Sequence, residues 1–165
     1  MKKQVQLMDN LDINKFSGLW YEVAYSMNIP YRKGDFGTIE YKTAEKNNMT
    51  VEHKLVRRDG SREHHKGDML MVNPSHYKIK YKTNWVTKLL KDDFRIADTD
   101  YENYAICYAR SRVIFWKNDY AWLLLRNRTE DEKVLNSLID KLSERTGITK
   151  ENIRITRHVE NVQNA

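Results

Sequence analysis

The sequence contains one cysteine, Cys107, so no disulfide can form within the chain, and a small fold held together by disulfides is excluded. Only two prolines and six glycines interrupt its 165 residues. Without a proline-rich, glycine-rich, repetitive or low-complexity stretch, the chain offers no linker at which to divide. We therefore expect one domain over residues 1–165, a length at which one hydrophobic core suffices.

Long apolar segments are also missing, because no run approaches the roughly 18 residues that a membrane-spanning helix needs. Met1-Lys2-Lys3 resembles the start of a secretory signal, but Gln4 to Asn10 supplies neither an apolar region nor a small-residue cleavage site. Two locations therefore stay open. The protein is cytoplasmic, or it is extracellular, periplasmic or outer-membrane-associated after removal of a signal segment.

The excess of positive charge is moderate and dispersed. Lys and Arg number 29 against 23 for Asp and Glu, which gives a formal net charge of +6. Basic residues alternate with apolar ones, as in Tyr77 to Lys82, and such alternation places them on the solvated face of a strand. This dispersal argues against a nucleic-acid partner and leaves peripheral contact with an anionic lipid surface as an alternative.

Motifs of common catalytic and metal sites are absent from the sequence, which has no HExxH, GxSxG, P-loop or CxxC pattern. We therefore expect a binding protein rather than an enzyme, with no catalytic residue, no metal and no cofactor. Cys107 is expected to be a small buried apolar residue, since burial raises the pKa of a thiol.

Eight segments alternate apolar and polar residues with period two, and turn signals separate them about every ten residues. They cover residues 20–28, 36–45, 49–57, 63–72, 76–83, 93–98, 104–112 and 119–127. We predict an all-β fold, an eight-stranded antiparallel up-and-down β-barrel over about residues 18–127, with an interior wide enough for one small ligand. A β-sandwich is the structural alternative.

The period changes to 3.6 after the strands, which predicts an amphipathic helix over about residues 130–146. Its apolar stripe consists of Val134, Leu135, Leu138, Ile139 and Leu142. Thr129 and Glu132 have the spacing of a capping box, and Gly147 offers a left-handed stop. We expect this helix to pack on the outside of the barrel, followed by a short ninth strand over about residues 152–157.

Three short motifs carry a resemblance to the lipocalin family. Gly18-Leu19-Trp20 resembles the first lipocalin signature, Thr99-Asp100-Tyr101 resembles the second, and Arg126 matches the third. They stand in the family's order, and the resemblance extends from Leu11 to about His158. The sequence of these motifs is most similar to that of the branch that contains bacterial lipocalins, apolipoprotein D and insect bilin-binding proteins.

The resemblance implies binding and transport of a small hydrophobic ligand, such as a fatty acid, a lysophospholipid or a similar lipid, inside the barrel. Two alternatives stay open. One is an enzyme on the same barrel, of the isomerase or de-epoxidase type. The other is a haem or tetrapyrrole carrier in which His53 or His65 contacts the ligand.

The signature residues are expected at a closed end of the barrel, which is needed if the interior is to act as a cup. They are Gly18, Trp20, Asp100, Tyr101 and Arg126. We expect the Arg126 guanidinium to lie over the Trp20 ring. Asp98 and Asp100 are expected to accept hydrogen bonds from backbone amides in a tight turn at the same end.

Parity along each strand then assigns the side chains that line the ligand site. They are Ile39, Tyr41, Val51, His53, Met69, Ile79, Tyr81, Phe94, Ile96, Cys107, Tyr120 and Trp122. Two loops, residues 29–35 and 85–91, are expected to rim the open mouth. Tyr31, Arg32, Lys33, Trp85 and Lys88 in these loops are expected to meet an anionic headgroup. A monomer or a weak homodimer is expected.

Overall fold

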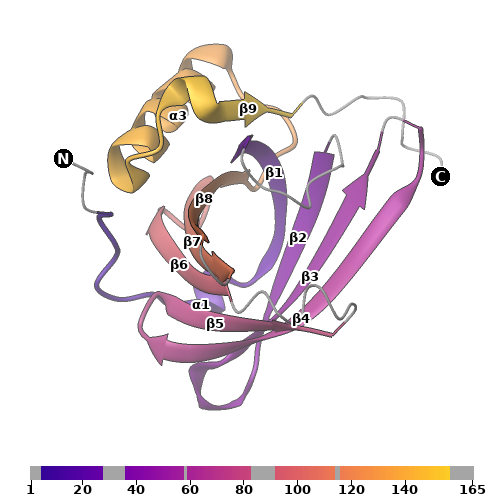
Figure 1. Ribbon diagram of the computed structural model, residues 1–165, viewed down its shortest axis with the longest axis vertical. Helices are drawn as coiled ribbons and strands as arrows, with labels where there is room; N and C mark the ends of the chain where they lie inside the picture. The colour runs from indigo at the N-terminus through magenta and orange to yellow at the C-terminus, as the bar shows by residue number, and fades with distance from the viewer. Residues whose placement is uncertain (1–4, 28–35, 58, 83–91, 114–115, 157–165) are drawn as a thin grey trace.

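Eight antiparallel strands form a closed barrel in the computed structural model, which describes residues 5–27, 36–57, 59–82, 92–113 and 116–156 (Figure 1). The strands are β1 (Gly18–Ser26), β2 (Phe36–Thr43), β3 (Met49–Val56), β4 (Arg62–Asn73), β5 (His76–Tyr81), β6 (Asp92–Thr99), β7 (Tyr104–Val113) and β8 (Trp116–Leu125). Each strand pairs with the next in the chain, and β1 pairs with both β2 and β8. The predicted all-β barrel is confirmed, and the sandwich alternative is wrong.

The strand ends differ from the prediction most clearly at β8. This strand begins at Trp116 rather than at residue 119 and ends at Leu125 rather than at residue 127. Its pairing with β7 extends as far as Val113 opposite Trp116, beyond the last clear alternation in the sequence. Arg126 therefore lies just after the strand and not within it.

A β-bulge in β1 changes which of its side chains face the interior. Glu22 lies opposite Leu124 of β8, but Ala24 lies opposite Leu123, so Val23 is the extra residue. Val23 and Ala24 both belong to an apolar cluster on the outside of the barrel. Simple alternation from Trp20 therefore predicts the inward-facing side chains of β1 correctly only as far as Glu22.

The bulge also marks the point where β1 changes partner along one edge. β2 pairs with residues 18–22 of β1, whereas β9 (Ile153–Ile155) pairs with residues 24–26. An unpaired strand edge exposes backbone donors and acceptors, so β9 covers the part of β1 that β2 leaves open. The expected ninth strand is present, and it is shorter than the predicted 152–157.

Helix α3 (Glu132–Thr146) packs against the outer face of the barrel, as expected. Its N-cap is Asp131, whose carboxylate accepts from the Lys133 amide at 2.9 Å. The predicted capping box beginning at Thr129 is therefore wrong, because Asp131 lies next to the first turn and accepts from one of its amides. Gly147 ends the helix in the left-handed conformation, with φ of 74°. In the described ranges, no helix is long and apolar enough to cross a bilayer.

The buried apolar side chains form two clusters, one inside the barrel and one on its outer face. Trp20 and Ile96 are fully buried members of the interior cluster. Ile106 and Leu123 point outward from β7 and β8, and they join Leu142 of α3 in the outer cluster. The helix therefore covers one side of the barrel and leaves the interior to the strands.

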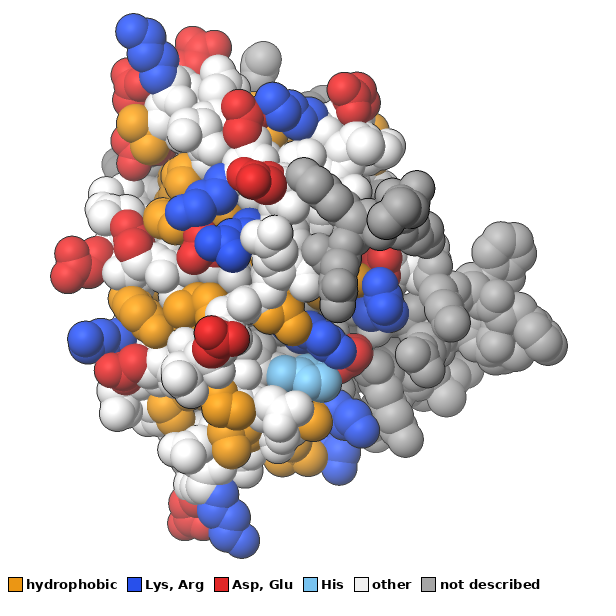
Figure 2. Space-filling model, turned by 90° about the vertical axis from the view of Figure 1, so that its left-hand side faces the viewer, with side chains coloured by type: hydrophobic (Ala, Val, Ile, Leu, Met, Phe, Trp, Pro, Cys, Tyr) orange, Lys and Arg blue, Asp and Glu red, His pale blue; other side chains and the backbone are white. Residues whose placement is uncertain are grey.

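Charged side chains of both signs are interspersed over the face shown in Figure 2, with no large area of one sign. Several surface lysines have an acidic neighbour, as in the pair Lys82 and Asp68, whose charged atoms lie 2.8 Å apart. Exposed pairs of this kind contribute about 0 to 1 kcal/mol each to stability. In each such pair a carboxylate balances the charge of the lysine beside it.

Candidate functional site

The short helix α1 (Ile13–Phe16) closes one end of the barrel. Asp12 caps this helix by accepting from the amides of Asn14 and Lys15 at 3.1 and 3.2 Å. The ring of Phe16 is fully buried, and its centroid lies 5.5 Å from that of Trp20 and 4.9 Å from that of Tyr41. Sequence reasoning missed this plug, because α1 is too short to show a period.

Arg126 holds together the segments that form the closed end of the barrel. Its guanidinium carbon lies 3.6 Å from the centroid of the Trp20 ring, as the signatures led us to expect. The guanidinium also donates to the carbonyls of Lys15, Phe16, Ser17, Leu19 and Tyr101. A Cβ on Gly18 would stand 3.2 Å from Nη1 of Arg126, and Gly18 has φ of 106°. Both facts favour glycine at this position.

The turn between β6 and β7 lies at the same end and depends on Asp100. Its carboxylate accepts from the amides of Glu102, Asn103 and Tyr104 at 2.8 to 3.2 Å. Burial alone raises the pKa of Asp100, but these donors outweigh burial and hold the pKa below its usual value.

Asp98 does not share this role, so that part of the prediction is wrong. Its carboxylate accepts from the Tyr104 hydroxyl at 2.9 Å and lies 2.8 Å from Nζ of Lys141 on α3. The pairing of β6 with β7 shifts register between Ile96 and Asp98, so Asp98 does not follow the simple alternation of the strand. Asp98 therefore links the barrel to the outer helix.

The predicted lining residues lie around the barrel interior. Ten of the twelve are buried members of the interior cluster, and Tyr81 is partly buried and packs against that cluster. His53 is the twelfth and approaches Glu22 over Gly37 of the intervening strand β2. Whether these side chains bind a ligand stays a prediction. Tyr25 and Met49 also belong to the cluster, and the sequence analysis did not select them.

The inward-facing side chains differ in exposure. Trp20 and Met69 have no exposed surface, whereas Trp122 is 9% exposed. The side chains of His53 and His65 are 14% and 23% exposed. Tyr120, farther along β8 from the closed end than Trp122, is nevertheless buried. The predicted rim loops, 29–35 and 85–91, lie outside the described residues.

Glu22 and two histidines bring polar groups into this apolar interior. Glu22 is fully buried, and its Oε2 lies 3.4 Å from Nε2 of His53. Gly37 lies between them on β2, and a Cβ there would stand only 2.9 Å from Nε2 of His53. The ring centroids of His53 and His65, which face each other across β3 and β4, are 6.5 Å apart. The sequence analysis did not select Glu22, although parity with Trp20 could have found it, because a carboxylate is unexpected in an apolar lining.

Burial lowers the pKa of His65, and the neighbouring His53 and His64 lower it further. His65 is therefore uncharged at neutral pH. Burial also raises the pKa of the Cys107 thiol, beside Tyr41, so the thiol stays protonated and is a poor nucleophile. In the part of the chain that the structure describes, no three His, Cys, Asp or Glu residues gather as a metal site would require.

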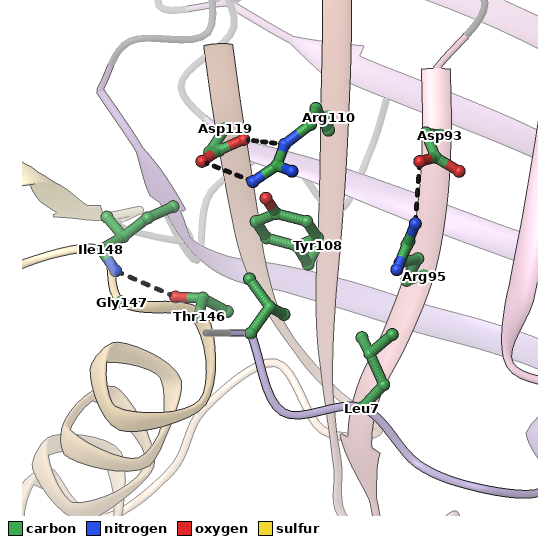
Figure 3. Close-up of a pocket in the computed structure, with 10 residues that line it drawn as sticks. Leu7, Asp93, Arg95, Tyr108, Arg110, Asp119, Thr146, Gly147 and Ile148 are labelled. Atoms are coloured by element: carbon green, nitrogen blue, oxygen red, sulfur yellow. Dashed lines mark hydrogen bonds and ion pairs between the residues drawn. The ribbon is translucent and has the colours of Figure 1, made fainter. Parts of the chain in front are cut away.

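A second hollow, of about 530 Å³, lies outside the barrel between the N-terminal segment, the end of α3 and the outward faces of β6 to β8 (Figure 3). Arg110 binds Asp119 through two hydrogen bonds of 2.7 and 3.2 Å, and Arg95 donates to Asp93 at 3.0 Å. Each guanidinium in the hollow is already paired with a carboxylate. These pairs fit a structural role on the outer wall.

Residues 11–158 match the family described as the lipocalin-like domain. The chain belongs to the lipocalin family. Members of this family typically bind small hydrophobic ligands, and this relationship favours a binding protein. The motifs around Trp20, Asp100 and Arg126 are thus lipocalin signatures, and the closed end described above is built from them.

Apolipoprotein D is among the relatives of this lipocalin. The Bos taurus protein is 29% identical over 155 residues, which cover 93% of this chain and 80% of the bovine protein. The Macaca fascicularis protein is 32% identical over 124 residues, which cover 74% of this chain and 64% of the macaque protein.

Solved structures of similar fold include two apocrustacyanins. Apocrustacyanin C1 has a TM-score of 0.70 at 19% identity, with 95% of this chain and 92% of that chain covered. Lobster apocrustacyanin A1 has a TM-score of 0.68 at 18% identity, with 92% and 89% covered. At such identities the likeness shows the fold alone.

Proposed function

We propose that this lipocalin binds and transports a small hydrophobic ligand, a fatty acid, a lysophospholipid or a similar single-chain lipid, in the interior of its barrel. The observation that carries the proposal is the inward-facing apolar and aromatic cluster, which Phe16 plugs at one end of the barrel. The kinship with proteins named apolipoprotein D agrees with a lipid ligand.

Burial of the hydrocarbon supplies the driving force. Each methylene removed from water contributes about 0.8 kcal/mol before the cost of ordering the chain. A long acyl chain therefore suffices for a micromolar dissociation constant, about −8 kcal/mol, with few polar contacts. The aromatic side chains of Phe94, Tyr120 and Trp122 give such a chain a rigid surface to pack against.

The buried, protonated thiol of Cys107 favours binding over catalysis in this proposal. The haem alternative would require His53 or His65 to ligate iron, but His53 already lies beside the Glu22 carboxylate. Peripheral contact with an anionic lipid surface, and a monomeric or weakly dimeric state, stay predictions.

A series of alcohols and fatty acids of increasing chain length tests the proposal. We expect the melting temperature to rise with chain length, since a ligand at a hundredfold excess over its dissociation constant adds about 2.7 kcal/mol to stability. Tryptophan fluorescence should fall on binding, because Trp122 lies in the lining.

One variant controls this measurement. Trp122→Phe should lose most of the quenching and keep the rise in melting temperature. Phe is a smaller ring of similar character, so the lining stays apolar. If no member of the series changes either the melting temperature or the fluorescence of the unmodified protein, the proposed function is wrong.

A further inference from the structure

We infer that the ring of Tyr41 forms the inner end of the ligand site and thereby sets the longest hydrocarbon chain that the barrel can bury. The inference rests on the proposed function, and it adds a limit on ligand length and the residue that imposes this limit. Its basis is the place of Tyr41 in the interior, between Phe16 of the plug and Phe94 on the opposite wall.

The Tyr41 side chain crosses the barrel. Tyr41 lies on β2 and Phe94 on β6, and these strands stand on opposite walls because three strands separate them on each side of the closed barrel. The centroids of the two rings are 6.3 Å apart, which is within the range of a direct aromatic contact. The Tyr41 hydroxyl is also hydrogen-bonded to the Cys107 thiol on β7. Tyr41 therefore extends from its own wall to the opposite one.

On its side towards the closed end, Tyr41 packs against the plug. The centroid of the Phe16 ring lies 4.9 Å from that of Tyr41 and 5.5 Å from that of Trp20. Phe16 and Trp20 have no exposed surface, and Tyr41 is 2% exposed. At these separations the rings are in contact, so a hydrocarbon chain cannot pass between Tyr41 and the plug. A chain that enters from the other end therefore stops at Tyr41.

Short side chains on β7 allow Tyr41 to reach that wall. Ala105, Cys107 and Ala109 belong to the interior cluster, and all three are buried. Burial raises the pKa of the Tyr41 hydroxyl and of the Cys107 thiol, so both groups stay uncharged at neutral pH. An apolar cluster that contains this uncharged pair suits the hydrocarbon end of a ligand. We therefore expect the hydrocarbon end, and not the polar end, against Tyr41.

This arrangement predicts a break in the dependence of affinity on chain length. Until the end of the chain reaches Tyr41, each added methylene is buried and raises the affinity by up to about fourfold. Once the chain meets the ring, a further methylene stays outside the lining or displaces the ring from its contacts with Phe16 and Phe94. The affinity then stops rising, and the length at the break measures the depth of the site.

The experiment measures the dissociation constants of straight-chain saturated fatty acids, from medium to long chains, by Trp122 quenching. We expect the break in the unmodified protein. Tyr41→Ala removes the ring and opens the space in front of Phe16, so the break should move to longer chains. Between the two breaks, the affinity of the variant should rise by up to about fourfold per carbon, while that of the unmodified protein does not rise.

Ile106→Ala is the matched control for the loss of a buried side chain. Ile106 is fully buried on β7 but belongs to the outer cluster, so its truncation lowers stability without changing the interior. The break should stay at the same length in this variant. Tyr41→Phe separates the ring from the hydroxyl. The hydrogen bond to Cys107 is lost, but the ring remains, so we expect an unchanged break there as well.

Tyr41→Leu provides a second test if Tyr41→Ala shows no cooperative thermal unfolding. Leucine keeps the position apolar and fills part of the space, but it is too short to cross to β6 and β7, so the break should again move to longer chains. An unchanged break in a folded Tyr41→Ala or Tyr41→Leu protein would overturn the inference, as would an affinity that rises without a break in the unmodified protein. Both results leave the proposed function intact. If no fatty acid of the series binds the unmodified protein, the proposed function itself is refuted.

Discussion

Arg126 joins three separate segments at the closed end of the barrel. It stacks on Trp20 of β1, donates to carbonyls at the end of α1 and donates to Tyr101 in the turn between β6 and β7. The last carbonyls of a helix have no partner within it, so an external donor is needed there. A planar guanidinium can meet these acceptors and the indole ring together, whereas a lysine ammonium cannot.

Arg126→Lys should therefore destabilise the protein by about 2 to 3 kcal/mol, since several hydrogen bonds from a charged donor are lost at once. Urea unfolding followed by tryptophan fluorescence measures the change. Arg128→Lys is the matched control, because Arg128 is exposed and lies 5.4 Å from the Tyr21 ring. Equal losses in the two variants would mean that Arg126 does not hold the closed end together.

At the scale of elements, α3 packs on the barrel more tightly through its second half than through its first. Leu142 is fully buried and Ile139 nearly so, although both belong to the same apolar stripe as Val134, which is 44% exposed. Leu142 shares the outer cluster with Ile106 and Leu123 of the barrel wall. The helix is therefore attached to the barrel mainly through its second half, which contains Ile139 and Leu142.

Leu142→Ala should lower the free energy of unfolding by about 2 to 4 kcal/mol, because it leaves a cavity between the helix and the barrel. Val134→Ala should change it by less than about 0.5 kcal/mol, since an exposed side chain loses little on truncation. Thermal unfolding of both variants tests the difference. A cost at Val134 as large as that at Leu142 would contradict the packing described above.

At the scale of the whole molecule, the segment before α1 connects the outer helix to the closed end of the barrel. The Gln6 amide donates to the carbonyl of Arg145 on α3 at 2.9 Å, and the Ser75 hydroxyl, in the turn between β4 and β5, donates to the carbonyl of Met8 at 2.7 Å. In Figure 1 this segment runs down the side of the molecule from α3 towards β5.

Ser75→Ala should cost about 1 to 2 kcal/mol, because the Met8 carbonyl loses its donor at a site where Ser75 is buried. Ser75 has φ of 68°, in the left-handed region, and alanine keeps the Cβ there, so the change removes the hydroxyl alone. Ser137→Ala, at an exposed helix position, serves as the control and should be neutral. Urea unfolding that shows no difference between the two would mean that the segment is not anchored through Ser75.

Local pattern predicted much of this lipocalin because its strands are half-buried and alternate regularly. The positions of Ile39, Tyr41 and Trp122 in the interior follow from period two and one fixed reference, Trp20. The errors arise where the structure departs from that regularity. The shift in β6 turned Asp98 towards α3, and Asp131 replaced Thr129 as the cap of that helix.

The sequence by itself determined the number of strands, the closing signatures and the apolar character of the lining, since each depends on residue type and spacing along the chain. Only the tertiary structure decided that Phe16 plugs the barrel and that Glu22 and His53 meet across Gly37. Those contacts join residues from different elements, and the distance between Glu22 and His53 depends on the register of β1, β2 and β3. No pattern within one strand contains that information.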